Sequence, residues 1–321
     1  MKTAKSKQET PQPIGVIQSL SSGFDLVTRH PDLMLMPILL DLFLWLGPRL
    51  SAYPLFRALI DFFNSPDMLA AMTPTQSQQM DAMRQLLDEV GQAFNLFWWL
   101  SPMLLGVPGV MVGSPVQKLP NGAPAVWPVS SGLMYVVFFV AFSLIGLGLA
   151  ASYWAMLSSR VREQAVSLGR FLAMWWGLVK IAVLLTLLVF IIGMPTMMAM
   201  TLVGLFSPFL AQLVVMMGAS LLLWAVFYLV FTVHGVALRD AQVIPSLWAS
   251  IRLMRAKFVP TMGLIIAAVG IYIGMGFVWN IPANDSWIKA AGILGNAFTG
   301  TGLLAATAIY YLERTAAPES K

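Results

Sequence analysis

Residues Leu178–Phe206 read LVKIAVLLTLLVFIIGMPTMMAMTLVGLF, a run in which Lys180 is the only charged residue. A helix that crosses the hydrocarbon core of a bilayer needs about 20 consecutive, mostly apolar residues, and this run exceeds that length. Four further segments also meet the requirement, which predicts an all-α integral membrane protein. They are Leu133–Leu157, Phe209–Ala237, Phe258–Ile281 and Ile288–Leu312.

The composition of the 321-residue chain agrees with a membrane environment. Hydrophobic residues make up 58% of it and charged residues 10%, and its mean hydropathy is +0.78, whereas soluble domains carry about 25% charged residues. The formal net charge of +5 comes from basic residues beside the apolar runs. This pattern indicates membrane topology and contact with anionic lipid headgroups rather than nucleic acid. The chain has no cysteine, which excludes disulfides, thiol nucleophiles and cysteine-ligated metals.

A weaker candidate for the first span is Leu33–Leu50, which is short and contains Pro37, Asp41 and Pro48. With this segment counted, the sequence predicts about six transmembrane helices in the cell membrane, with both termini in the cytoplasm. Most basic residues then lie on the cytoplasmic side, as the positive-inside rule requires. Those that fall outside are Arg49, Arg57, Arg84, Lys118 and Lys289.

The segment Phe94–Val112 is apolar enough for a seventh span, but it contains Pro102, Gly106, Pro108 and Gly109. A span here would invert every later segment and place most of the basic clusters outside. Non-helical backbone inside the hydrocarbon region is stable only where it is buried in protein or lines a water-filled cavity. We therefore expect a re-entrant or an interfacial segment, and the sequence leaves open which of the two.

The longest region between spans is Ser51–Ser131, on the outer side. Within it, Thr73-Pro74 has the form of a helix N-cap followed by proline at the first helical position. Apolar residues then recur at helical spacing among Gln, Asp and Arg residues. The pattern predicts an amphipathic outer helix at about Thr75–Phe94.

Three segments share one pattern, a Ser-Leu pair followed at fixed spacing by apolar residues on one stripe of a helix. They are Ser19–Val27, Ser167–Trp175 and Ser246–Met254. Each precedes a predicted span, so the predicted unit is a cytoplasmic interfacial helix, a span outward and a span back, occurring three times. Chance similarity among apolar, basic-flanked helices is the alternative.

The repeat also predicts the organisation of the chain, with the outer region inserted into the first unit. The predicted parts are a disordered cytoplasmic tail 1–13, a first unit 14–157 with the extracytoplasmic insertion 51–131, a second unit 158–238, a third unit 239–314 and a cytoplasmic tail 315–321.

Basic and aromatic residues in or near these interfacial helices are candidate contacts for lipid headgroups or for a partner protein. The alternative is a structural anchor that sets the depth of each span, with Lys180 extending toward the interface. The candidates are Arg29, Arg170, Trp175, Trp176, Lys180, Arg252, Arg255 and Lys257.

Asp41 and Asn296 form the candidate intramembrane polar site. Asp41 is the only carboxylate well inside a predicted span, and such a group is expected to face the bundle, a cavity or a partner. It could serve as a proton or cation site, sit near the interface, or be protonated. Asn296 is expected to hydrogen-bond where the last two spans approach through small residues. These small residues are Gly270, Gly274, Ala291, Gly295 and Thr299.

No catalytic, cofactor or metal site is predicted. The sequence lacks a Walker loop, a His-Glu-x-x-His pattern and a Gly-x-Ser-x-Gly pattern. An enzyme would need paired acids or a nucleophile beside a base. The two histidines, His30 and His234, have few acidic neighbours, and we expect capping or interfacial roles for both rather than a metal site.

The chain resembles uncharacterised bacterial multi-pass proteins, including Yip-like proteins and the membrane domain attached to some glycerophosphodiester phosphodiesterases. The resemblance rests on Ser19–Leu46, which passes through Arg29-His30-Pro31, and on Ile244–Gly270. No region is large enough for the catalytic barrel of such an enzyme, so the resemblance implies a membrane module without hydrolase activity.

The sequence lacks catalytic motifs and contains predicted parallel repeats and interfacial helices. These features favour a non-enzymatic scaffold, assembly factor or accessory subunit. The alternative is a transporter or lipid-handling protein with a cavity near Asp41. The expected partners are a bilayer with anionic headgroups and another membrane protein, with no nucleic acid and no cofactor.

Overall fold

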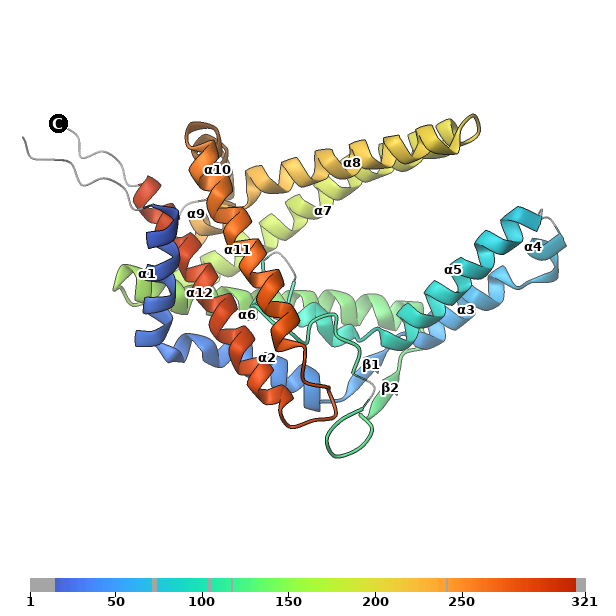
Figure 1. Cartoon of the computed structure of the whole chain (residues 1–321), viewed down its shortest axis with the longest axis horizontal. Helices are drawn as coiled ribbons and strands as arrows, with labels where there is room; N and C mark the ends of the chain where they lie inside the picture. The colour runs from blue at the N-terminus through green and yellow to red at the C-terminus, as the bar shows by residue number, and fades with distance from the viewer. Residues whose placement is uncertain (1–14, 71–73, 103–104, 117, 241, 316–321) are drawn as a thin grey trace, which may run out of the picture.

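Figure 1 shows the chain as a computed structural model that describes residues 15–70, 74–102, 105–116, 118–240 and 242–315. These residues form helices almost throughout, together with one short two-stranded sheet. The predicted tail 1–13 lies outside the described residues, as does nearly all of the predicted tail 315–321. The prediction of an all-α membrane protein is confirmed in this coarse form.

Five segments of the described chain are long and apolar enough to cross a membrane. Each coincides with a span predicted from the sequence. They are α6 (Gly132–Arg162), α7 (Leu168–Gly204), α8 (Pro208–Leu229) continued by α9 (Thr232–Arg239), α11 (Phe258–Trp279) and α12 (Lys289–Thr315).

The predicted first span is shorter than expected. Residues Pro31–Met34 form a 3₁₀ turn (η1), and α2 covers only Leu35–Leu46. At 1.5 Å per residue a helix of this length extends about 18 Å, which is less than the hydrocarbon thickness of about 30 Å. The predicted span Leu33–Leu50 is therefore not a full-length helix.

The helices converge around α9, which lies in the core of the bundle. All of its residues from Thr232 to Leu238 are buried. From this region the α7–α8 hairpin and the α11–α12 hairpin diverge (Figure 1). The buried residues of α7 lie near its start, at Met174, Gly177, Leu178 and Ile181. The rest of the α7–α8 hairpin therefore extends away from the core.

His234 belongs to this core rather than to an interface. Its ring centroid lies 5.0 Å from those of Trp154 and Phe231, and its Nε2 lies 3.0 Å from the Thr307 hydroxyl. The expected capping or interfacial role is wrong for His234 because four helices surround α9. The same expectation holds for His30, which is the C-cap residue of α1 (Val16–Arg29).

The break between α8 and α9 is held by a serine of the neighbouring helix α10 (Val243–Ala256). The Ser250 hydroxyl donates to the Tyr228 carbonyl at 2.7 Å and accepts from the Phe231 N–H at 3.2 Å. Buried backbone groups need such partners, so Ser250 satisfies the groups that the interrupted helix leaves free.

The repeated Ser-Leu segments adopt two different arrangements. In α1 the stripe Ser19, Gly23 and Val27 is buried, and in α10 the corresponding stripe includes Ser246 and Ser250. In the second copy Ser167 caps α7 instead, accepting from the Arg170 N–H at 3.3 Å. Because α7 continues unbroken from there into the span, the prediction of a separate interfacial helix is wrong for the second unit.

Helix α1 packs across α12. Its Gly23 lies so close to α12 that an added Cβ would overlap the Gly302 carbonyl oxygen and approach the Ala306 nitrogen to 2.5 Å. On the other helix, Gly302 faces the ring of Phe24. Small residues thus let α1 and α12, the first and last helices described, cross closely.

The region between α2 and α6 forms a helical hairpin on a small sheet. Strand β1 (Arg49–Ser51) pairs in parallel with β2 (Val126–Pro128). Helices α3 (Tyr53–Phe63), α4 (Pro66–Ala70) and α5 (Pro74–Ala93) follow β1 and project from the bundle (Figure 1). The helix predicted at Thr75–Phe94 is confirmed by α5.

Arg49 joins the hairpin to the rest of the molecule. Its guanidinium is buried and donates to the carbonyls of Gln92 and Ala93 at 2.5 and 3.1 Å, at the end of α5, and to the Val116 carbonyl at 3.1 Å. A cation at a helix C-terminus satisfies carbonyls that lack partners inside the helix.

Candidate functional site

Asp41 lies fully buried on α2 and is bound by backbone N–H groups. Its Oδ2 accepts from Val110 N–H at 2.9 Å, and its Oδ1 accepts from Met111 N–H at 3.0 Å. Gly109 permits this approach, because a Cβ there would lie 2.8 Å from Asp41 Oδ1. The carboxylate therefore holds the end of the broken segment Phe94–Val112 against α2.

The broken segment begins with a capped 3₁₀ turn, η2 (Leu96–Leu100). The Asn95 side chain accepts from the N–H groups of Phe97, at 3.2 Å, and Leu50, at 3.1 Å. Within this segment Met103 and Leu104 lie outside the described residues. The turn and the loop after it show that Phe94–Val112 is not a spanning helix, as predicted.

Two glycines on the spans make room for this segment. A Cβ at Gly146 of α6 would lie 2.6 Å from the Trp99 carbonyl oxygen, and a Cβ at Gly300 of α12 would lie 2.6 Å from Pro108 Cβ. Irregular backbone is tolerated beside spans when protein covers it. Here α2, α6 and α12 provide that cover.

Polar side chains of two helices, α11 and α12, lie within electrostatic range of Asp41. Lys289, at the start of α12, is buried, donates to Asn280 Oδ1 at 2.9 Å and acts on Asp41 electrostatically. Tyr272 of α11 lies within electrostatic range of Asp41. Asn296 of α12 is buried, and its Nδ2 has no hydrogen-bond partner among the described residues. The described contacts therefore do not join the predicted pair Asp41 and Asn296 by a hydrogen bond. Sequence reasoning missed Lys289 and Tyr272, since both are more than 200 positions from Asp41 in the chain.

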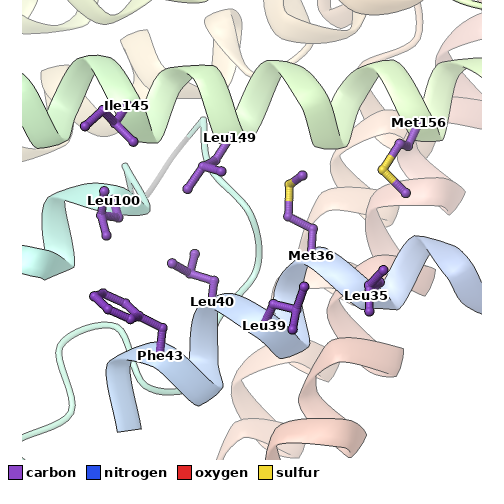
Figure 2. Close-up of a pocket in the computed structure, with 9 residues that line it drawn as sticks. All are labelled: Leu35, Met36, Leu39, Leu40, Phe43, Leu100, Ile145, Leu149 and Met156. Atoms are coloured by element: carbon purple, nitrogen blue, oxygen red, sulfur yellow. The ribbon is translucent and has the colours of Figure 1, made fainter. Parts of the chain in front are cut away.

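An apolar cavity lies beside α2, and Asp41 is not among the residues that line it. The groove lies between α2 and α6 (Figure 2) and has a volume of about 430 Å³. Every residue that lines it is apolar, so the groove offers no polar group to a solute. The lining residues are Leu35, Met36, Leu39, Leu40, Phe43, Leu100, Ile145, Leu149 and Met156.

The basic and aromatic candidates of the second unit mostly contact the protein itself. Arg170 pairs with Asp240, the left-handed C-cap residue of α9, and Arg162 binds the same carboxylate at 3.0 Å. The Trp175 indole donates to the Leu144 carbonyl at 3.2 Å. These contacts favour structural anchoring over headgroup contact for Arg170 and Trp175.

The remaining candidates lie at the surface of the bundle. Trp176 is exposed, and the Lys180 ammonium lies 5.8 Å from the centroid of its ring, an arrangement typical of a cation–π pair. Four others are exposed on α1 and around α10, where they are available to headgroups. These are Arg29, Arg252, Arg255 and Lys257.

Within the described residues no group of three or more His, Asp or Glu side chains could hold a metal ion. The described geometry around Asp41 pairs one carboxylate with backbone donors and places no nucleophile beside a base. No family model matches the chain, and neither the curated proteins nor the solved structures contain a match to it. The arrangement must therefore be interpreted from its own chemistry.

Proposed function

We propose that the protein is a non-enzymatic multi-pass membrane protein that acts as a scaffold, assembly factor or accessory subunit. The observation that supports this role is an exposed apolar face on the α3–α5 hairpin, which lies beyond the five candidate spans. A hairpin outside the bilayer that presents apolar side chains is suited to binding another protein.

The two helices of the hairpin are antiparallel and meet through one stripe on each. Tyr53 donates to Asp88 Oδ1 at 2.7 Å, Arg84 donates to the Phe63 carbonyl at 2.8 Å, and Gly91 packs against Phe56. These contacts fix which side chains face outward. The remaining surfaces of both helices are available to a partner.

The exposed apolar residues of the hairpin form one continuous face. On α3 they are spaced i, i+3, and on α5 they are spaced i, i+3, i+7, so those of each helix share one side of it. Because the helices are antiparallel, both sets lie on the same side of the contact between the helices. Each is between 42% and 59% exposed. We call them the hairpin face; they are Leu59, Phe62, Met83, Leu86 and Val90.

The charge of the hairpin favours a protein partner over the lipid surface. Acidic residues outnumber basic ones on α3, α4 and α5, and anionic headgroups repel acidic segments. A partner with an apolar patch would bury the hairpin face without that repulsion. The acidic residues are Asp61, Asp67, Asp81, Asp88 and Glu89, and the basic ones are Arg57 and Arg84.

We expect the double substitution Phe62→Ser and Leu86→Ser to remove a stoichiometric partner from the protein purified in native nanodiscs. Two central contacts of an interface are together worth about 2 kcal/mol or more, so recovery of the partner should fall at least tenfold. Both residues are exposed, and such substitutions change stability by about 0.5 kcal/mol or less. Quantitative mass spectrometry of the purified complex measures the loss.

The matched control is Asp61→Ser with Gln85→Ser, two exposed residues on the opposite side of the same helices. This variant should retain the partner. A wild-type protein that purifies as a monomer with no stoichiometric partner would contradict the proposed role, and equal recovery with both double variants would contradict the hairpin face.

The proposal includes six membrane crossings, with both termini in the cytoplasm and α2 serving as the short first crossing. The positions of the basic residues support this topology: Arg160 and Arg162 end α6, and Arg314 lies in the last turn of α12. The three-unit layout is supported by α1 and α10, because the first and third Ser-Leu segments bury the same positions on these helices.

The topology can be measured by cysteine labelling, because the chain has no cysteine of its own. We expect Gln164→Cys, in the loop between α6 and α7, to react with an impermeant maleimide only after the membrane is permeabilised. Asn121→Cys, in the exposed outer loop, should react in intact cells. The reverse pattern would exclude a cytoplasmic position for the α6–α7 loop.

Lipid handling is a second candidate function, favoured by the apolar groove between α2 and α6. The cavity expected near Asp41 is not what supports it, because the described surroundings of that carboxylate are filled by Val110, Met111 and Gly109.

A further inference from the structure

The groove between α2 and α6 has the shape of a channel along one stripe of a membrane span. Ile145, Leu149 and Met156 lie on one side of α6 and face Leu39 and other residues of α2 (Figure 2). From Ile145 to Met156 the helix rises about 16 Å. Leu39 and Ile145 are more than half exposed, so the groove is accessible from the side of the protein.

A charged pair lies beyond Met156, on the two segments that form the walls of the groove. Arg160 lies one turn beyond Met156 on the same stripe of α6, and Asp32 lies one turn before Met36 on the other wall. Arg160 Nε and Nη2 donate to Asp32 Oδ2 at 3.3 and 2.9 Å. The two side chains are 44% and 42% exposed.

This pair retains hydrogen-bonding capacity while it is intact. Among the described residues, Arg160 Nη1 donates to no acceptor and Asp32 Oδ1 accepts from no donor. A guanidinium is well suited to phosphate oxygens, and a carboxylate is suited to an ammonium. The two free positions are opposite in charge.

We propose that the groove binds one acyl chain of a glycerophospholipid with an amine-bearing, zwitterionic headgroup. The chain occupies the apolar channel, the phosphate contacts Arg160, and the ammonium contacts Asp32. Because the pair is neutral overall, it complements a zwitterionic headgroup better than an anionic one. The proposal does not depend on the scaffold role, since a bound lipid is compatible with either function.

The site is tested by measuring lipid retained on the purified, delipidated protein by native mass spectrometry. The protein is first incubated with mixed micelles that contain equal amounts of dioleoyl phosphatidylethanolamine and dioleoyl phosphatidylglycerol. We expect one retained lipid per chain, with the ethanolamine lipid preferred at least fivefold. Leu149→Trp, which fills the groove, should reduce retention at least tenfold, and so should Leu39→Trp from the opposite wall.

The control for added bulk is Val140→Trp, at an exposed position of α6 on another side of the helix, which should retain lipid as the wild type does. When dioleoylglycerol is added to the same micelles, the wild type should retain the phospholipid in preference to it, and Arg160→Gln should abolish that preference. Failure of the wild type to retain lipid, or equal retention by Leu149→Trp, Leu39→Trp and Val140→Trp, would overturn the groove as a site. Equal retention of the two phospholipids would overturn the headgroup assignment.

Discussion

Replacing Asp41 by alanine should lower the free energy of unfolding by about 2–6 kcal/mol. The substitution leaves the N–H groups of Val110 and Met111 buried without acceptors, and each orphaned donor costs about 1–3 kcal/mol. Water cannot easily replace the carboxylate, because Asp41 is fully buried. The segment around residues 105–116 should then detach from α2.

Two measurements check this expectation. Reversible unfolding in mixed micelles with increasing dodecyl sulfate gives the loss of stability, and limited proteolysis reports whether residues 105–116 become accessible. The control is Asp25→Ala, at an exposed position of α1, which should change stability by about 0.5 kcal/mol or less. An Asp41→Ala variant as stable as this control would show that the two hydrogen bonds do not hold the segment.

Asp41→Asn separates the hydrogen bonds from the charge. The amide keeps one acceptor oxygen, but its NH₂ group would face a backbone donor. We therefore expect a loss of stability close to that of alanine. A variant with normal stability would instead indicate that Asp41 is protonated and that its role is not to accept two hydrogen bonds.

Gly23→Leu should separate α1 from α12 and destabilise the protein by about 3 kcal/mol. The new side chain would meet the backbone of Gly302 and Ala306, and backbone atoms within a helix cannot move aside as a flexible side chain does. The face of α1 that carries Ser19 and Val27 would then become accessible.

The separation can be followed at Val27, which is fully buried. In a Val27→Cys background, Gly23→Leu should raise the rate of maleimide labelling at least tenfold. The matched control is Gly270→Leu on α11, where an added Cβ would meet nothing within 4 Å. If both leucine variants label at the parent rate, the close crossing of α1 and α12 is not essential.

Much of the fold could be predicted from the sequence because a bilayer imposes a local rule. A span needs a long apolar run, and α6, α7, α11 and α12 each contain such a run. The start of α7 was not predicted, because this helix begins at Leu168 and not with its apolar run at Leu178. Helix α5 was equally predictable, since its apolar spacing and its Thr73-Pro74 start are local signals.

The candidate site depended on contacts that no local pattern reports. Gly23 looked like a variable position in the repeat, yet its missing side chain is what lets α12 approach. Conversely, Gly270 and Gly274 looked like a packing motif, but a Cβ at either would meet no other atom within 4 Å. Small residues permit close packing, and only the position of a second helix decides whether it occurs.

The partners of Asp41 illustrate the same limit. The sequence identified the carboxylate as unusual and the segment Phe94–Val112 as broken, but it did not connect them. The connection needs the loop after η2 to reach Asp41. The Gly47-Pro48 pair marks the end of α2, but no local signal places that loop against the carboxylate.

The crossing of α1 and α12 also constrains how the chain can be assembled. Ribosomes make α1 first and α12 after all the other spans, so the small-residue stripe of α1 has no native cover during most of membrane insertion. The helix made first must wait for the helix made last. Its docking therefore completes the bundle, and a chain cut short before α12 would display an uncovered stripe that quality-control proteases could recognise.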